Sequence, residues 1–230
     1  MEGVCLAAYS FPANSWEVLP KVEWLSDAQG FSEEQCYHTF QMVVVEEQLY
    51  LLVRTPVGVQ IARYSASTRS LELFPLLPNF TDIEGGNRPE SYKSIRVQTI
   101  GRKVYLAGLL NGCLYLSSFN TETGRWTLLE PYFGFASDCS SSDYCYNSLR
   151  MVALPTRLVL FYRGNTTTVF TLYDLTESRW RNKVGSSWVA EGKYNVPGYY
   201  VSFQGVVVDG KLYTLMRTEN DVKIARLDIA

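Results

Sequence analysis

The sequence contains very little histidine, since His38 is the single one among 230 residues. A metal site built from several imidazole ligands is therefore excluded. A Ser-His-Asp or Cys-His catalytic site would have to use His38, and the nucleophile pattern G-x-S-x-G is absent. We therefore assign no catalytic residue. The sequence leaves open whether the protein is an enzyme and favours one that is not.

Excess positive charge is also absent, because 21 Lys and Arg stand against 23 Asp and Glu, which gives a formal net charge of -2. Sequence-independent binding to nucleic acid needs many cationic contacts to phosphates, so a nucleic-acid partner is not expected. No apolar run approaches the roughly 18 residues of a membrane span. Residues 1–8 lack the basic segment of a signal peptide. We expect a protein without a membrane span, cytoplasmic by default or secreted without a signal peptide.

Cysteine is sparse, with five residues and no C-x2-C pair of the kind that binds zinc. No metal site and no cofactor are predicted.

What the sequence does contain is a repeat of about 54 residues. In each copy an aromatic residue is followed by a short turn and then, seven positions later, by Trp or Leu. A fixed period of this length means that one supersecondary unit is reused along the chain. The four copies run from Tyr9 to Trp16, from Tyr64 to Leu71, from Phe119 to Trp126 and from Tyr173 to Trp180.

Each unit has the composition of a small β-sheet. Short runs rich in Val, Leu, Ile, Tyr and Phe alternate with turn residues, which is typical of strands. In the first full copy these runs are 40–46, 49–54, 59–64 and 71–76. No stretch shows sustained 3.6-residue periodicity, so little helix is expected. Repeated four-stranded antiparallel units of this length predict a β-propeller.

The two ends of the chain supply parts of a further blade. The N-terminus contributes a third and a fourth strand, 4–9 and 16–19, and the C-terminus a first, second and third, 203–208, 212–217 and 222–228. We predict an all-β, four-bladed β-propeller, a single domain over 1–230, in which the termini share one blade and so remove open sheet edges. The repeat units are approximately 21–77, 78–130, 131–184, and 185–230 together with 1–20.

The third strand is present at both ends, so one copy is surplus. The shared blade would then carry a fifth strand, or one end would pair elsewhere, for example with another subunit in a homo-oligomer. The alternative folds are a five-bladed propeller and an open array of sheets.

Two turn segments resemble the corner between the third and fourth strands of kelch repeats. They are Tyr173-Asp-Leu-Thr-Glu-Ser-Arg-Trp180 and Phe119-Asn-Thr-Glu-Thr-Gly-Arg-Trp126, and the resemblance extends over the second strand, as in Lys103-Val-Tyr-Leu-Ala-Gly108. The double glycine of kelch repeats is absent. The resemblance implies a kelch-like propeller and, as one function, a platform for a protein partner.

Three sets of polar residues recur at equivalent positions of the copies. A Tyr precedes the first strand and is followed two residues later by Thr or Ser. The second strand ends in Arg in three copies and in Leu109 in the remaining one. Each long connection between blades carries an acidic residue. In an antiparallel pair the second strand ends at the same edge of the blade at which the first strand begins. The three sets of residues are therefore expected on one rim of the propeller. With two connection tryptophans, the candidate ligand-binding residues are Trp24, Asp27, Tyr37, Thr39, Arg54, Asp82, Tyr92, Ser94, Asp138, Tyr146, Ser148, Arg163, Trp188, Glu191, Tyr200, Ser202 and Arg217.

Two interpretations of these sets remain open. Recurrent polar groups can hold neighbouring blades together, because buried polar groups need hydrogen-bond partners. Alternatively, they bind a ligand, since the connections are long and rich in aromatic rings, and such rings stack on the C–H face of a sugar. Trp16, Trp126 and Trp180, at the repeat corners, are expected in the core.

The leading hypothesis is a non-enzymatic recognition module that binds carbohydrate, like a lectin, through repeated sites on one loop face. Its partner would then be a glycan or another small polar ligand. The first alternative is a kelch-like platform for a protein partner. The second is a glycan-processing enzyme in which Asp27, Asp82, Asp138 and Glu191 approach one another near the axis.

Overall fold

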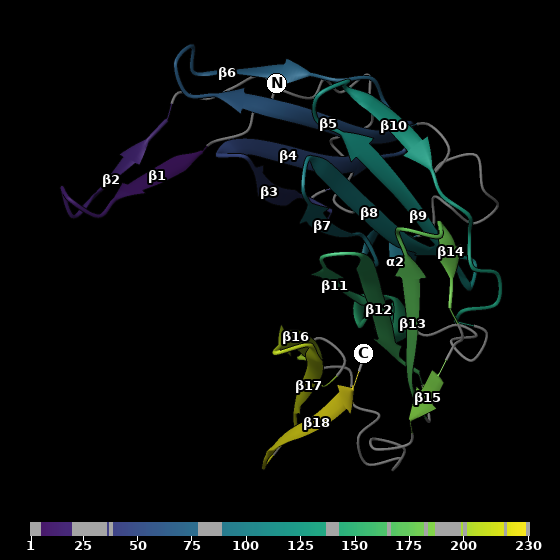
Figure 1. Ribbon diagram of the computed structural model, residues 1–230. Coiled ribbons are helices and arrows are strands. Elements are labelled where there is room, and N and C mark those ends of the chain that lie inside the picture. Colours follow the sequence, from purple (N-terminus) through teal and green to yellow (C-terminus); the bar gives the residue numbers. More distant parts are fainter. Residues whose placement is uncertain are drawn as a thin grey trace.

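The computed structural model confirms an all-β propeller, with blades arranged along an arc (Figure 1). It describes residues 6–19, 36, 39–77, 89–136, 143–164, 167–181, 184–186, 199, 202–218 and 220–228. Within these ranges the strands form five antiparallel sheets. The long strands are made of alternating and β-branched apolar residues, which suit a sheet that is packed on both faces.

Three of the sheets are complete blades whose four strands follow one another in sequence order. In the third blade an additional short strand, β15 (Val184–Ser186), also pairs with β13. The strands are β3 (Gln41–Val45), β4 (Gln48–Thr55), β5 (Gly58–Ser65) and β6 (Ser70–Leu73); β7 (Arg96–Ile100), β8 (Lys103–Leu110), β9 (Cys113–Asn120) and β10 (Arg125–Leu128); and β11 (Arg150–Leu154), β12 (Arg157–Arg163), β13 (Thr168–Asp174) and β14 (Arg179–Trp180).

The seven-residue spacing of the repeat corresponds to one tight corner. Tyr64 pairs directly with Leu71 across β5 and β6, and Phe119 pairs with Trp126 across β9 and β10. The residue five positions after the first member has a positive φ in every copy, and such a left-handed conformation closes the turn. These residues are Asn14 (φ 49), Arg69 (φ 52), Gly124 (φ 65) and Ser178 (φ 52).

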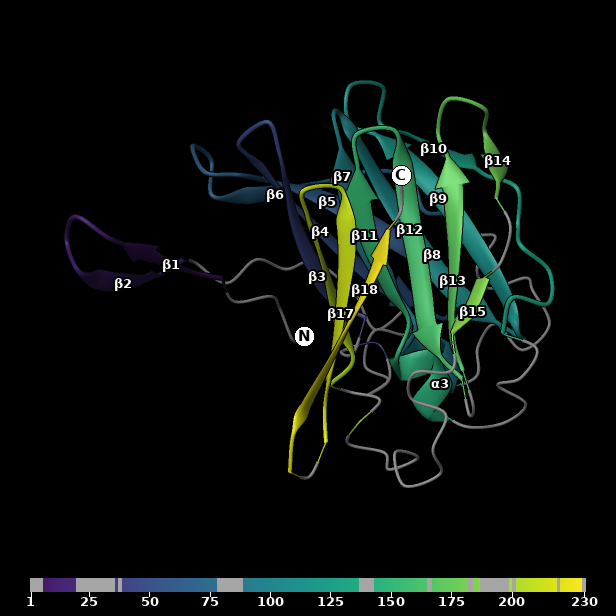
Figure 2. The same ribbon diagram turned by 60° about the horizontal axis from the view of Figure 1, so that its bottom comes forward.

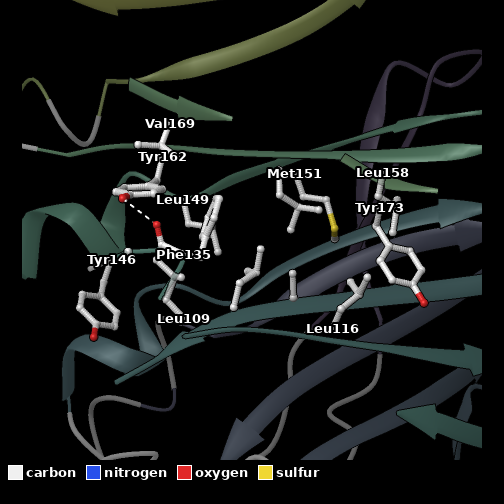
Figure 3. Close-up of a cluster of buried hydrophobic side chains, with 14 of the residues drawn as sticks. Leu109, Leu116, Phe135, Tyr146, Leu149, Met151, Leu158, Tyr162, Val169 and Tyr173 are labelled. Atoms are coloured by element: carbon white, nitrogen blue, oxygen red, sulfur yellow. Dashed lines mark hydrogen bonds between the residues drawn. The ribbon is translucent and has the colours of Figure 1, made fainter. Parts of the chain in front are cut away.

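The core lies between the blades rather than inside any one of them. Tyr50, Leu52 and Ile61 of the first complete blade pack against Leu106 and Phe119 of the second. A second cluster joins the second and third blades, where Leu109 and Leu116 face Met151, Leu158 and Tyr162 (Figure 3). Each blade is therefore stabilised by apolar burial against its neighbours.

The two ends of the chain form separate small sheets. The hairpin of β1 (Ala7–Ser10) and β2 (Ser15–Val18) makes one of them. The other contains β16 (Gln204–Val208), β17 (Lys211–Arg217) and β18 (Val222–Asp228). They lie at opposite ends of the arc (Figure 1), and no strand pairing joins them in the part of the chain that the structure describes.

The prediction of a blade shared between the termini is therefore not met in this structure, and the number of blades stays a prediction. The reason is that the hairpin packs on the first complete blade. Leu6 lies in a cluster with Leu51 and Val53, and Glu17 forms an ion pair with Arg69 at 3.2 Å.

The blades have two different rims. Short helices α2 (Pro89–Tyr92) and α3 (Asp143–Asn147) lead into the first strands β7 and β11 and define what we call the helix rim. Tight turns such as β7–β8 and β11–β12 lie on the opposite rim, which we call the turn rim; Figure 2 shows these turns at the top and α3 at the bottom. No helix in the described ranges is long and apolar enough to cross a membrane.

Candidate functional site

The helix rim is held together by a hydroxyl group that recurs in each blade. The hydroxyl of Ser148 donates to the carbonyl of Cys145 at 2.7 Å and accepts the backbone N–H of Arg163 at 2.9 Å. It thus joins the turn before the first strand to the end of the second. The same pair of bonds is made by Thr39 with Cys36 and Arg54, by Ser94 with Ser91 and Leu109, and by Ser202 with Tyr199 and Arg217.

Two of the three predicted arginines are buried. Arg54 and Arg163 have 0% relative exposure, whereas Arg217 at the C-terminal end of the arc is exposed. The guanidinium of Arg54 lies over the ring of Tyr92, which belongs to α2 at the start of the next blade. Burial lowers the pKa of Arg54 to about 10, while Tyr92 acts in the opposite direction. Arg54 is therefore a cation in the interface between two blades.

The second blade uses an apolar residue at the same place. Leu109 takes the position of Arg54 and shares a buried cluster with Tyr146 of α3, which takes the position of Tyr92 (Figure 3). The hydroxyl of Tyr146 accepts the N–H of Gly112 at 3.2 Å. The contact between blades is thus repeated, with the apolar side chain in place of the cation.

Two arginines that the sequence analysis did not select lie beside these positions. Arg96 donates to four carbonyl groups, including Asn147 O at 2.8 Å and Leu149 O, which belong to the next blade. Burial, together with the nearby charge of Arg150, lowers the pKa of Arg96 to about 9. Arg96 therefore connects the second blade to the third.

Arg150 repeats this role between the third blade and the C-terminal sheet. It donates to Asn147 O and Leu149 O, both at 2.7 Å, and to Gln204 Oε1 of β16 at 3.2 Å. Burial lowers its pKa to about 10. Both arginines stand two residues after the recurrent serine, so comparing the repeat copies at that position would have found them.

One exposed aromatic ring lies on the helix rim close to a long connection. Phe133 is 70% exposed, directly after Tyr132, whose backbone pairs with that of Leu114. Its neighbour Phe135 instead points inward, with its ring 4.9 Å from that of Tyr162. The backbone thus anchors the turn on both sides and leaves the Phe133 ring in solvent.

The described candidate residues divide by exposure. Thr39, Arg54, Tyr92, Ser94, Tyr146, Ser148 and Arg163 are buried, Ser202 is half-buried and Arg217 is exposed. The other candidates lie outside the described residues: Trp24, Asp27, Tyr37, Asp82, Asp138, Trp188, Glu191 and Tyr200.

The corner tryptophans differ in their surroundings. Trp126 and Trp180 pack against the clusters between blades, and the indole N–H of Trp126 donates to Pro75 O at 3.1 Å. The expectation of a core position is wrong for Trp16, which is 70% exposed. Trp16 lies on the hairpin at the end of the arc, where this structure places no preceding blade against it.

Among the residues with described positions, no group of three or more His, Cys, Asp or Glu side chains is placed to hold a metal ion.

Comparison with known proteins supports the fold and leaves the family open. No protein-family model and no curated protein matches the sequence. A crystal structure of a protein from Lactobacillus plantarum is similar with a TM-score of 0.52, at 14% identity, covering 98% of this chain and 64% of that one. A GH43 glycoside hydrolase has a TM-score of 0.47, at 13% identity, over 82% of this chain and 38% of its own.

The β-propeller domain of the Trilobed protease from Pyrococcus furiosus has a TM-score of 0.42, at 6% identity, over 83% of this chain and 58% of its own. The chain thus spans less than two thirds of the length of each of these structures.

Proposed function

We propose that the protein is a non-enzymatic, kelch-like recognition module that binds carbohydrate through its helix rim, in the manner of a lectin. One observation carries this proposal: the two rims are built differently. The described ends of β6 and β10 and the starts of β7 and β11 lie on the helix rim, so the strands on both sides of a connection between blades meet there. The stretches 20–35, 78–88, 137–142 and 187–198 of these connections lie outside the described residues. Long loops presented by a rigid sheet scaffold are where binding residues concentrate.

The packing below the helix rim supports recognition. The hydroxyl bonds, the Arg54–Tyr92 contact and the bonds of Arg96 fix the bases of the connections. Rigid bases reduce the conformational entropy that a loop loses when it binds. Arg54 and Arg163 are buried, so we expect the ligand contacts to come from the side chains of the connections and from exposed groups such as Phe133 and Arg217.

The ring of Phe133 offers a direct test. A sugar that stacks on an exposed ring loses that contact in Phe133→Ala, and we expect binding to weaken about tenfold, equivalent to about 1.4 kcal/mol. The matched control is Phe11→Ala, because Phe11 is also an exposed phenylalanine, 85% exposed, but lies in the β1–β2 turn. Trp188→Ala tests a predicted platform in the last connection.

The measurement is saturable binding on a panel of glycans, followed by calorimetric titration of the best binder. Binding that Phe133→Ala or Trp188→Ala weakens and Phe11→Ala leaves unchanged supports the proposal. A blank panel with an intact thermal transition overturns it, and capture of one protein partner through the same residues then favours the interaction platform. Release of sugar products that is lost in Asp27→Asn or Glu191→Gln replaces it with the glycan-processing enzyme.

A further inference from the structure

The C-terminal sheet presents a blade face on which no other described strand packs. Each complete blade continues from its third strand to a fourth, whereas β18 pairs only with β17 among the described strands. Leu212 pairs with Leu227 as Leu49 pairs with Tyr64 in the first complete blade. The two sheets can therefore be compared residue by residue, with a constant offset of 163 positions between these pairs.

In the first complete blade the equivalent face is covered by the next blade. The first complete blade buries Val59 and Ile61 against the second blade, with 1% and 0% exposure. Their equivalents Val222 and Ile224 are 58% and 66% exposed. The same offset relates the exposed Val206, Val208 and Leu215 to Val43, Val45 and Leu52. It also relates the half-buried Tyr213 to Tyr50.

The opposite side of the same sheet is already used. Leu212 and Met216 are fully buried against Phe161 and Phe170 of the third blade. The exposed side is therefore the one that would receive a following blade. Contiguous apolar residues on a solvent-facing sheet mark an interaction surface.

The β1–β2 hairpin carries the matching half of such an interface. Phe119 and Trp126 are among the residues of the second blade that pack with Tyr50 and its neighbours in the first. Tyr9 and Trp16 occupy the same paired positions in the hairpin, and their rings lie 5.2 Å apart, as do those of Phe119 and Trp126. Trp16 and Val18 are 70% and 75% exposed.

We propose that the exposed face of β16–β18 binds the β1–β2 hairpin of a second copy of this chain, and so reproduces between chains the interface that joins blades within one chain. The hairpin of the same chain is held at the opposite end of the arc by Leu6 and by the ion pair of Glu17 with Arg69. The contact joins two different surfaces, so it is a head-to-tail association, which forms rings or open chains of copies. Such assembly would place several helix rims on one particle.

The test uses sedimentation velocity over a concentration series with Trp16→Asp, Ile224→Asp and the control Leu128→Asp. Leu128 is 49% exposed on the outer strand of a complete blade, away from both surfaces. We expect concentration-dependent association of the wild type and of the control, and an association at least tenfold weaker in Trp16→Asp and in Ile224→Asp. Circular dichroism and thermal melts of each variant establish that the blades are intact.

Mixing the two variants gives the decisive result. Each keeps one intact surface, so a mixture of Trp16→Asp and Ile224→Asp should form a 1:1 dimer that does not grow further. A wild type that stays monomeric at all concentrations, with both variants losing thermal stability, overturns the proposal and shows that the hairpin closes the ring within one chain. Association that neither variant weakens also overturns it.

Discussion

The guanidinium carbon of Arg54 lies 4.3 Å from the centroid of the Tyr92 ring, across the boundary between two blades. Both side chains have 0% relative exposure. A desolvated contact of this kind contributes about 2 kcal/mol. The residue that the sequence selects as a ligand contact is thus part of the packing that holds the propeller together.

Replacing Arg54 tests this role. We expect Arg54→Ala to lower the free energy of unfolding by about 2–4 kcal/mol, because it removes the contact with Tyr92 and leaves a cavity. Arg54→Leu should cost less, since Leu109 fills the same place in the second blade beside Tyr146. Urea unfolding of the three proteins measures both differences.

The exposed equivalent Arg217 is the control, and Arg217→Ala should change stability by less than about 0.5 kcal/mol. If Arg54→Leu lowered the free energy of unfolding as much as Arg54→Ala, then Leu could not replace Arg at this position of the repeat, and the prediction would be wrong.

The architecture follows from local sequence patterns, whereas the burial of the site does not. The expected run 59–64 is found as β5 (Gly58–Ser65), because strand formation depends on alternating apolar residues and nearby turns. The Tyr64–Leu71 pairing likewise follows from one tight turn. Whether Arg54 is exposed depends instead on Tyr92, 38 positions later, which only the packing of the next blade brings close.

The exposure of Trp16 in the N-terminal hairpin could not be predicted from the sequence either. Trp16, Trp126 and Trp180 share one position in the repeat, so the sequence predicts one environment for all three. Their exposure differs because a preceding blade covers Trp126 and Trp180 but not Trp16. Pairing between the terminal sheets likewise depends on contacts between residues far apart in the sequence, such as those of Leu6 with Leu51 and Val53.

Ser148 provides a prediction about the recurrent hydroxyl. We expect Ser148→Ala to cost about 1–3 kcal/mol of unfolding free energy, because the buried N–H of Arg163 loses its acceptor. Ser148→Thr should be nearly neutral, since Thr39 makes the same two bonds in the first complete blade. Thermal and urea unfolding provide the measurement. Equal losses in the two variants would mean that packing around the side chain, not the hydroxyl, decides stability.

We predict that replacing Gly205 on β16 by alanine destabilises the protein. A Cβ atom there would lie 2.3 Å from Cζ of Phe161, which is fully buried beside Phe170 and Phe203. Such overpacking costs about 1–3 kcal/mol, so Gly205→Ala should weaken the contact between the third blade and the C-terminal sheet.

Gly185→Ala is the matched control, because a Cβ at Gly185 would meet nothing within 4 Å. Its effect should stay below about 0.5 kcal/mol. Adding Phe161→Leu to Gly205→Ala should recover part of the loss, and urea midpoints of the single and double variants show whether the two residues are coupled. Strictly additive losses would rule out a direct clash.

Asp174 gives a prediction about pH. Its carboxylate, 6% exposed, accepts the Thr176 hydroxyl at 2.6 Å and the N–H of Glu177 at 3.2 Å, and Arg181 lies 3.3 Å away. The hydrogen bond from Thr176 lowers the pKa of Asp174 most, and the backbone N–H groups and Arg181 lower it further, against an opposing effect of burial.

The folded-state pKa therefore lies below the unfolded value of about 3.9. The stability that Asp174 contributes is present above that value and is lost as the pH falls through the folded-state pKa. We expect the difference in unfolding free energy between the wild type and Asp174→Asn to be constant above about pH 5 and to shrink between about pH 4 and pH 2. Asp209→Asn, in an exposed turn, is the control. A difference that stays constant down to pH 2 would show that the carboxylate bonds do not stabilise the folded protein.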